Sequence, residues 1–420
     1  MIEFEYKDKE KELAKTYWAW HTVNSYDSAI KSGEVKTRSK NVTLQDAMIH
    51  YHHISAMATS ANISRNIRRN RRASATALRD GNAKPIRDLF TGPCPDCAMP
   101  GEKIPREKPE FANSPPGLYC PKCNKTFLSK SIYYQTPVFS VAGGPSLNKN
   151  ATELKRVAGK YPIFTCDAAL RSLNYMGVVP DYVITVEQDP MIMRAIDGID
   201  TSGMTLIAVA GVSPELRKAW KGKVYLFDSI YYNKRQEKIG KALLGDLGWA
   251  CPGGNVSSMM LSLCIGVMAK PIIFVGHDFS YTELKDYYPI GGPMSMIPIK
   301  QVYTTHDIYG RRVYTDSSLY SYKDWHEKLV MTMGQDRLVK FVNATEGGIF
   351  GASYYDPQKH VKISKWWRET KYRINTRIKE GVWPTPGDVQ IGAYVGDRIE
   401  NMEFLTLKEA IDKYCPEADK

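Results

Sequence analysis

The chain has 420 residues, more than one ordinary core accommodates, and its 43% hydrophobic and 24% charged residues are typical of a globular protein. No run of about 18 apolar residues occurs, so the sequence predicts no membrane span. The N-terminal segment is charged from the start and lacks a signal-peptide core, and half of the eight cysteines form Cys-x-x-Cys pairs. Both features favour a cytoplasmic protein with reduced thiols.

The formal charge of +12 is concentrated in two segments. Residues 1–137 contain 22 Lys and Arg against 14 Asp and Glu, and residues 361–380 contain 7 against 2. The rest of the chain is close to neutral. Such basic patches suit a polyanion, an anionic membrane surface or an acidic protein face.

Residues 1–90 are predicted to form a basic helical region, because the stretch 42–89 has few helix breakers. Five arginines fall within residues 64–72 and cover more than one helix face, so they are not all buried. They have two interpretations: a solvated helix surface, or an arm that contacts the phosphates of a nucleic acid.

Residues 91–135 are rich in Pro, Gly and Cys and predict a zinc ribbon. Two Cys-x-x-Cys pairs, separated by 22 residues, can supply four thiolates to one tetrahedral ion with no open position, which indicates a structural Zn²⁺. A redox pair is the weaker alternative, because no βαβ pattern surrounds either motif. The ligands of the predicted site are Cys94, Cys97, Cys120 and Cys123.

From residue 138 onward, short apolar runs alternate with helical segments. Continuous apolar strands separated by helices predict a mainly parallel sheet that is covered on both faces. We therefore expect a doubly wound α/β domain of Rossmann type. The predicted strands are residues 138–142, 162–166, 182–186, 205–209, 224–227 and 271–275, and the predicted helices are 152–161, 168–176 and 257–268.

Several polar and glycine-rich motifs follow these strands. In a parallel sheet the ligand lies at the carboxyl ends of the strands, near the point where the strand order reverses. Glycine turns bring backbone amides close to a nucleotide, and a helix N-terminus favours an anion. Together the motifs predict a nucleotide site, and they contain Gly143, Gly144, Pro145, Ser146, Asp167, Glu187, Gly254, Asn255, Ser257, His277 and Asp278.

These motifs resemble those of one superfamily, which joins the Maf motility-accessory factors with the MptE-like 6-hydroxymethylpterin diphosphokinases. The resemblance covers residues 138–350 and resumes at 401–414; segments 313–316, 322–325 and 342–348 resemble the Maf branch more closely. The motifs that carry it are Gly-Gly-Pro-Ser-Leu at 143–147, the segment 167–186, Gly-Gly-Asn-Val at 253–256 and Phe-Val-Gly-His-Asp-Phe-Ser-Tyr at 274–281.

The resemblance implies a fold of the GT-A/sialyltransferase-like kind and one of two activities. Maf proteins transfer a nonulosonic acid from a CMP-sugar to a protein hydroxyl, and MptE-like enzymes transfer pyrophosphate from ATP to a pterin alcohol with Mg²⁺. A nucleotide-sugar glycosyltransferase is the leading hypothesis, and a diphosphokinase is the second. A non-catalytic protein whose ribbon and arginines bind a nucleic acid or an assembly is the third.

The resemblance also implies roles for individual residues. Residues 143–146 would bind phosphate and ribose, Asp167 and Asn255 would contact the sugar or base, and Glu187, Gly254 and Ser257 would complete the nucleotide site. His277, Asp278 and Glu346 are the catalytic candidates, and the general base stays open between His277, His306 and a carboxylate. In a diphosphokinase, Mg²⁺ would bind Asp167, Glu187, Asp189 or Asp278.

The predicted organisation therefore has five parts. A helical N-terminal region (1–90) and the ribbon (91–135) precede a nucleotide-binding transferase domain (138–350). A basic insertion (351–398) follows, and a C-terminal helix (399–420) completes the transferase domain.

Overall fold

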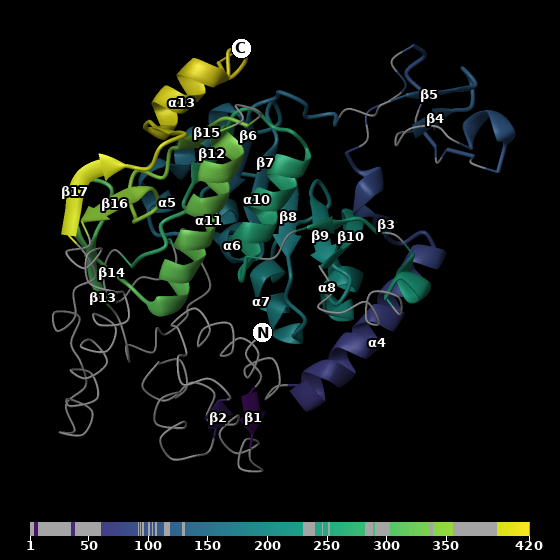
Figure 1. Ribbon diagram of the computed structural model, residues 1–420, viewed down its shortest axis with the longest axis horizontal. Coiled ribbons are helices and arrows are strands. Elements are labelled where there is room, and N and C mark those ends of the chain that lie inside the picture. Colours follow the sequence, from purple (N-terminus) through teal and green to yellow (C-terminus); the bar gives the residue numbers. More distant parts are fainter. Residues whose placement is uncertain are drawn as a thin grey trace.

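The computed structural model of the protein is an α/β domain with a small ribbon beside it (Figure 1). It describes residues 4–6, 35–37, 60–90, most of 92–127, 131–229, 240–281 apart from 246, 251 and 252, residue 289, and residues 303–335, 339–355 and 393–419.

The domain is built on one parallel sheet of ten strands. Its order is β11-β10-β9-β8-β7-β6-β12-β15-β18, and β3 also pairs with β10. The chain winds outward from β6 in one direction, then returns to β12 and winds in the other, so the strand order reverses between β6 and β12. The strands are β3 (Lys84–Pro85), β6 (Val138–Val141), β7 (Ile163–Cys166), β8 (Tyr182–Thr185), β9 (Thr205–Val209), β10 (Lys223–Ser229), β11 (Trp249–Ala250), β12 (Ile272–Val275), β15 (Phe341–Asn343) and β18 (Met402–Phe404).

Helices cover both faces of the sheet, which confirms the predicted doubly wound fold. Successive strand residues alternate between the two cores: Ile272 and Phe274 pack on one side with residues of α10 and α11, and Ile273 and Val275 pack on the other with residues of α5 and α13. Within the described residues, no helix has the length and apolar character that crossing a bilayer demands. The helices of the domain are α5 (Leu147–Asn150), α6 (Asp167–Tyr175), α7 (Met193–Ile196), α8 (Pro214–Ala219), α10 (Val256–Gly266), α11 (Ser317–Gln335) and α13 (Leu407–Tyr414).

The remaining strands form two-stranded antiparallel pairs outside the main sheet. Two of these hairpins lie between the later strands of the domain, and a third belongs to the ribbon. The pairs are β1 (Phe4–Tyr6) with β2 (Val35–Thr37), β4 (Leu118–Cys120) with β5 (Lys125–Phe127), β13 (Tyr303–His306) with β14 (Arg312–Thr315), and β16 (Ala352–Tyr355) with β17 (Ala393–Arg398).

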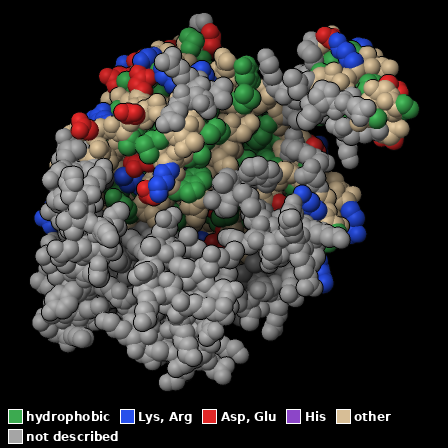
Figure 2. Space-filling view, viewed as in Figure 1, with side chains coloured by type: hydrophobic (Ala, Val, Ile, Leu, Met, Phe, Trp, Pro, Cys, Tyr) green, Lys and Arg blue, Asp and Glu red, His purple; other side chains and the backbone are tan. Residues whose placement is uncertain are grey.

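The ribbon leaves and rejoins the domain at one place. The amide of Ile132 donates to the carbonyl of Phe90 at 3.2 Å, so the two ends of the excursion lie side by side. The Phe90 ring packs against Tyr182 at the start of β8, which places this neck at the edge of the sheet where strands begin. In Figure 2 the ribbon protrudes from the domain at the upper right, and it carries basic, acidic and hydrophobic side chains.

The arginine-rich segment forms helix α4 (Ser60–Arg79), and part of it is docked on the sheet. Asn70 is fully buried, and its side-chain amide donates to the carbonyls of Gln188 (3.2 Å) and Gly211 (3.0 Å). Arg71 pairs with Asp228 at 2.8 Å. The segment therefore packs as part of the domain, although Arg69 and Arg72 are exposed. Arg71 is thus engaged inside the domain, and contact of the exposed arginines with a nucleic acid stays a prediction.

The boundaries of several predicted parts also differ from those observed. Residues 70–90 pack on the sheet and supply β3, so this part of the predicted helical region belongs to the domain; residues 4–6 and 35–37 of that region are strands rather than helix. The predicted helix 152–161 is instead the single turn α5 followed by a 3-10 helix, Ala151–Arg156. The C-terminal part contains β18 as well as α13. The ends of the predicted insertion form β16 and β17, whereas its basic segment 361–380 lies outside the described residues.

Replacing Asn70 with Ala is expected to destabilise the protein by about 2 kcal/mol, because it removes a buried donor shared by two carbonyls. Urea unfolding measures the change. Arg72→Ala, on the exposed side of the same helix, is the matched control and should stay within about 0.5 kcal/mol of the wild type. Equal effects of the two substitutions would show that α4 is not anchored through Asn70.

Candidate functional site

Three loops meet at the point where the strand order reverses. They follow β6, β12 and β15, which are neighbours in the sheet. Asp278, after β12, accepts hydrogen bonds from the backbone amide of Ser146 (3.0 Å) and from its hydroxyl (2.5 Å). The carbonyl of Asp278 accepts from the amide of Ile349, in the loop after β15, at 2.8 Å. We call these bonds the Asp278 clasp.

Two glycines allow the loops of the Asp278 clasp to approach so closely. A Cβ on Gly144 would lie 2.3 Å from the carboxylate of Asp278, and a Cβ on Gly348 would lie 2.3 Å from the Cα of Asp278. Gly348 also has a φ of +72°, which side chains other than glycine rarely adopt. Glycine is therefore required at both positions by contact with the same aspartate.

The Asp278 carboxyl is buried, and this burial raises its pKa to about 6, despite the opposing effects of the Ser146 hydrogen bonds and of the nearby Lys149. Ser146 is also buried, at 2% exposure. The amide and hydroxyl that the sequence assigned to phosphate are thus engaged by an acidic partner inside the protein. The structure makes Asp278 a group that positions the turn, and phosphate binding by this turn stays a prediction.

Asp167 follows β7 and begins helix α6. Its Oδ1 accepts from the amide of Ala168 at 2.7 Å, and its Oδ2 accepts from the hydroxyl of Thr185 at 2.5 Å. Burial raises the pKa of Asp167 to about 6, and the charge of Glu187 adds to the shift. Unlike Asp278, Asp167 keeps part of its surface accessible. Glu187, after β8, is exposed, and its Oε1 accepts from the amides of Gln188 (2.8 Å) and Asp189 (3.0 Å).

The motif Gly-Gly-Asn-Val at 253–256 leads into helix α10. This helix packs across β6, β7 and β8. Asn255 caps the helix: its side chain accepts from the amide of Ser258, whose hydroxyl in turn lies within hydrogen-bonding distance of the Asn255 amide. The hydroxyl of Ser257 donates to Asn255 Oδ1 at 3.1 Å. Gly254 lies against the Tyr322 ring of α11. The caps explain these polar residues structurally, and nucleotide contact by them stays a prediction.

His277 lies on the face of the sheet that α10 and α11 cover, with only 1% of its surface exposed. Its Nε2 is 3.1 Å from the carbonyl of Ser140, and its ring is 5.8 Å from that of His326 on α11. Burial, together with the charge of His326, lowers its pKa well below the ordinary value. The His277 ring therefore lies among buried aromatic rings, and its role as a catalytic base stays a prediction. His326 was not expected from the sequence, although it directly follows the motif at 322–325.

Glu346 also has an internal role. Its Oε1 accepts from the side chain of Asn150 (3.0 Å) and from the amide of Leu407 (2.9 Å), which is the first residue of α13. It therefore joins the C-terminal helix to the loop after β15. His306, the other imidazole considered as a base, is part of β13 and lies opposite Arg312 in the strand pair β13–β14.

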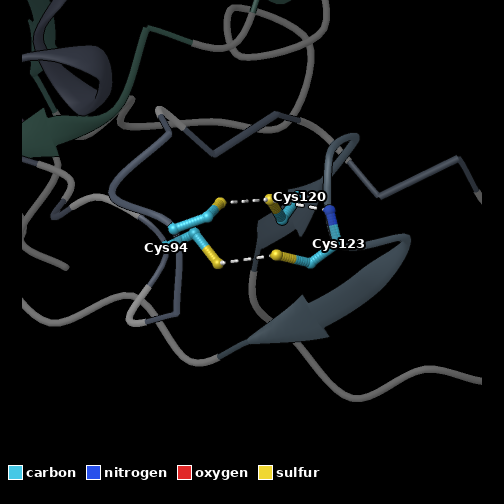
Figure 3. A group of neighbouring side chains, drawn as sticks. Cys94, Cys120 and Cys123 are labelled. Carbon is cyan, nitrogen blue, oxygen red and sulfur yellow. Dashed lines mark hydrogen bonds between the residues drawn. The ribbon is translucent and has the colours of Figure 1, made fainter.

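The four predicted metal ligands come together in the ribbon (Figure 3). All four sulfur atoms lie within 4.8 Å of one another. Cys94 and Cys123 are 3.9 Å apart, and Cys97 and Cys120 are 3.4 Å apart. A tetrahedral ion with metal–sulfur bonds of about 2.3 Å requires sulfurs separated by about 3.8 Å. The donor set and its spacing therefore fit a metal ion.

One comparison with known proteins agrees with the motif resemblance. A family model described as 6-hydroxymethylpterin diphosphokinase MptE-like matches residues 118–284. This match confirms the resemblance to the superfamily. It runs from β4 through β12, so it includes both strands at the reversal of strand order.

Two further comparisons are less informative. A glycosyltransferase structure, the Maf protein of Magnetospirillum magneticum AMB-1, is 20% identical with a TM-score of 0.41, and the match covers 52% of this chain. The matched part spans a third (33%) of that protein. A search of curated proteins found no match.

Replacing Asp278 with Asn should preserve the Asp278 clasp, because the amide can accept from the Ser146 amide and donate to its hydroxyl. The folded pKa of Asp278 is about 6, above the ordinary 3.8. The wild type should therefore gain stability relative to the variant as the pH falls from 6 to 4, by at most about 3 kcal/mol. Urea unfolding over this range measures the difference.

Asp200→Asn is a control for which the stability difference from the wild type should change with pH in the opposite direction. Hydrogen bonds from Ser202 lower the pKa of this exposed carboxylate. The wild type should therefore lose stability relative to that variant on acidification. A difference between wild type and Asp278→Asn that does not change with pH would contradict the assignment of a raised pKa to Asp278.

Proposed function

We propose that the protein is a nucleotide-dependent transferase that moves a sugar from a nucleotide-sugar, of the CMP-sugar type, to a hydroxyl acceptor. The observation that carries the proposal is the carboxyl edge of the sheet, where the motifs of the MptE-like match surround the reversal of strand order. Ligands of doubly wound sheets bind at this place.

In the proposed reaction Asp167 is the general base. It removes the proton of the acceptor hydroxyl while the acceptor oxygen bonds to the anomeric carbon. The bond between that carbon and the phosphate oxygen breaks, and its electron pair leaves with the nucleotide. A carboxylate with a pKa of about 6 is ionised at neutral pH and still basic enough to accept a proton. As a whole residue, Asp167 is partly exposed, whereas His277 and Asp278 are buried.

The carboxylates at the carboxyl edge do not by themselves decide between glycosyl transfer and the magnesium-dependent alternative. Among the described residues, the four cysteines are the only group of three or more His, Cys, Asp and Glu side chains placed to hold a metal ion. Asp278 is occupied by Ser146, and Glu187 is bonded to neighbouring amides. Mg²⁺ usually binds one or two carboxylates together with substrate phosphates and water, so these contacts do not exclude Mg-ATP; no step is assigned to Mg²⁺.

Pyrophosphate transfer from ATP to a small alcohol is the second candidate, and the description of the matching family favours it. The two candidates differ in the nucleotide that the site should bind. A thermal-shift panel of CMP, UDP, GDP and ATP, each with and without Mg²⁺, separates them. A ligand at 100 times its dissociation constant stabilises the folded state by about 2.7 kcal/mol.

We also propose that the four cysteines bind a structural Zn²⁺. Zn²⁺ prefers four thiolates in a closed tetrahedral site, and the ribbon has too small a core, Ile104, Phe111 and Tyr119, to fold on packing alone. Zinc thiolates require reduced cysteines, which agrees with the expected cytoplasmic location.

The transferase proposal predicts that CMP raises the melting temperature without Mg²⁺, and that the protein releases CMP from CMP-N-acetylneuraminate with water as acceptor. The rate should rise with pH through about 6, as Asp167 loses its proton. Asp167→Asn should lower the rate by about 100-fold or more and abolish this rise.

Asp181→Asn is the matched control, because this carboxyl also has a pKa raised by burial but lies before β8, at the opposite edge of the sheet. It should leave the pH profile unchanged. Stabilisation by Mg-ATP alone would replace the first candidate with the second. An unchanged rise in rate in Asp167→Asn would remove Asp167 as the base.

The zinc proposal predicts one zinc per chain by elemental analysis of protein purified without added metal. Cys94→Ser and Cys120→Ser should each abolish zinc binding, because three thiolates leave the tetrahedral site open. Cys415→Ser changes a thiol outside the cluster and should retain full zinc content. A zinc-free wild-type protein with reduced thiols would contradict the proposal.

A further inference from the structure

The backbone amides of the glycine turn are already used inside the protein, so they are not available to bind a nucleotide phosphate. The amides of Gly144, Ser146 and Leu147 all donate within the protein. The turn also places a carboxylate at its centre, and a carboxylate repels phosphate. A phosphate near this turn therefore needs cations from outside it.

One such cation lies directly beside the turn. Lys149 is exposed on α5, and its Nζ donates to the carbonyl of Glu346 at 3.3 Å. The same Nζ would lie 3.6 Å from a Cβ on Gly347, so it is adjacent to the loop after β15. Its charge also acts on Asp278, as the lowering contribution to the pKa of that carboxyl shows.

A second group of cations is linked to the same loop through Ile308. The carbonyl of Gly348 accepts from the amide of Ile308, and the carbonyl of Ile308 accepts from Arg398 at 3.5 Å. The guanidinium groups of Arg311 and Arg398 lie 4.8 and 5.8 Å from the centre of the Tyr309 ring. Tyr309 as a residue is 48% exposed, and its ring offers a flat aromatic surface beside the cations.

Around the loop after β15, the acidic side chains are buried or bonded internally and the basic side chains are exposed. The carboxylates of Asp278 and Asp307 are buried, and Glu346 is bonded to neutral donors. The cations are exposed. Arg311 pairs with Asp307, whereas neither Lys149 nor Arg398 forms an ion pair among the described residues. Asp397 adjoins Arg398 on β17, but successive strand residues point to opposite faces.

We propose that Lys149 and Arg398, with Tyr309 beside them, form the phosphate subsite of the nucleotide site. This inference rests on the proposed function and deepens it. The phosphate is bound by side-chain cations on the β12–β15 side of the strand reversal, rather than by the amides of the glycine turn. The ligand is a nucleoside phosphate, and the exposed Tyr309 ring provides a stacking surface beside its charge.

Isothermal titration with CMP and with inorganic pyrophosphate tests the subsite. Lys149→Gln and Arg398→Gln should each weaken binding of both probes by about tenfold or more, because each removes a charged hydrogen-bond donor. Lys328→Gln, at an exposed position on α11, is the matched control and should bind like the wild type. Because Arg398 also packs on the Phe404 ring, Arg398→Lys is included; it keeps the charge and should restore part of the affinity.

The outcomes separate this inference from the proposed function. Wild-type binding of CMP that is unchanged in both glutamine variants overturns the subsite and leaves the transferase proposal standing. Binding of pyrophosphate but not CMP, lost in the variants, supports the subsite and contradicts CMP as the nucleotide. Binding of neither probe by the wild type overturns both proposals.

Discussion

The hydrogen bonds between Asp278 and Ser146 determine the shape of the carboxyl edge. They join the loop after β6 to the loop after β12, the two strands between which the winding of the sheet reverses. The loop after β15 is fixed by the same residue, through its carbonyl and through the close approach of Gly348. Asp278 therefore contacts the loops on either side of its own, one through its carboxylate and the other through its backbone.

The fold was predictable because its strands are buried on both faces. Such strands appear in sequence as short, continuous apolar runs, and the six predicted runs match β6, β7, β8, β9, β10 and β12. β15 and β18 were not predicted as strands, although both lie in segments that carry the resemblance. β3 has only two residues and contains a proline, so no pattern in the sequence marks it as part of the sheet.

The sequence predicted where the candidate site lies in the sheet, but it did not predict the contacts of the individual residues. The motifs do meet at the strand reversal, yet the partner of a polar side chain depends on contacts between distant residues. Ser146 and Asp278 are 132 positions apart, and Glu346 is 61 positions from the amide that it accepts from. Sequence spacing cannot show that these groups satisfy one another. Several polar side chains of the motifs therefore have internal partners that the sequence did not reveal, and their contact with a ligand stays a prediction.

The neck of the ribbon has a consequence for how the chain is divided. Because Ile132 bonds to Phe90, the ribbon is an excursion that starts and ends at the same point, between two segments of one domain. A short turn could bridge these residues without moving β3 or β6. The excursion also departs from the edge where strands begin, opposite the loops of the Asp278 clasp. In the described residues, β4 and β5 of the ribbon pair with each other and not with the main sheet, so the hydrogen bonding of the sheet does not pass through the ribbon.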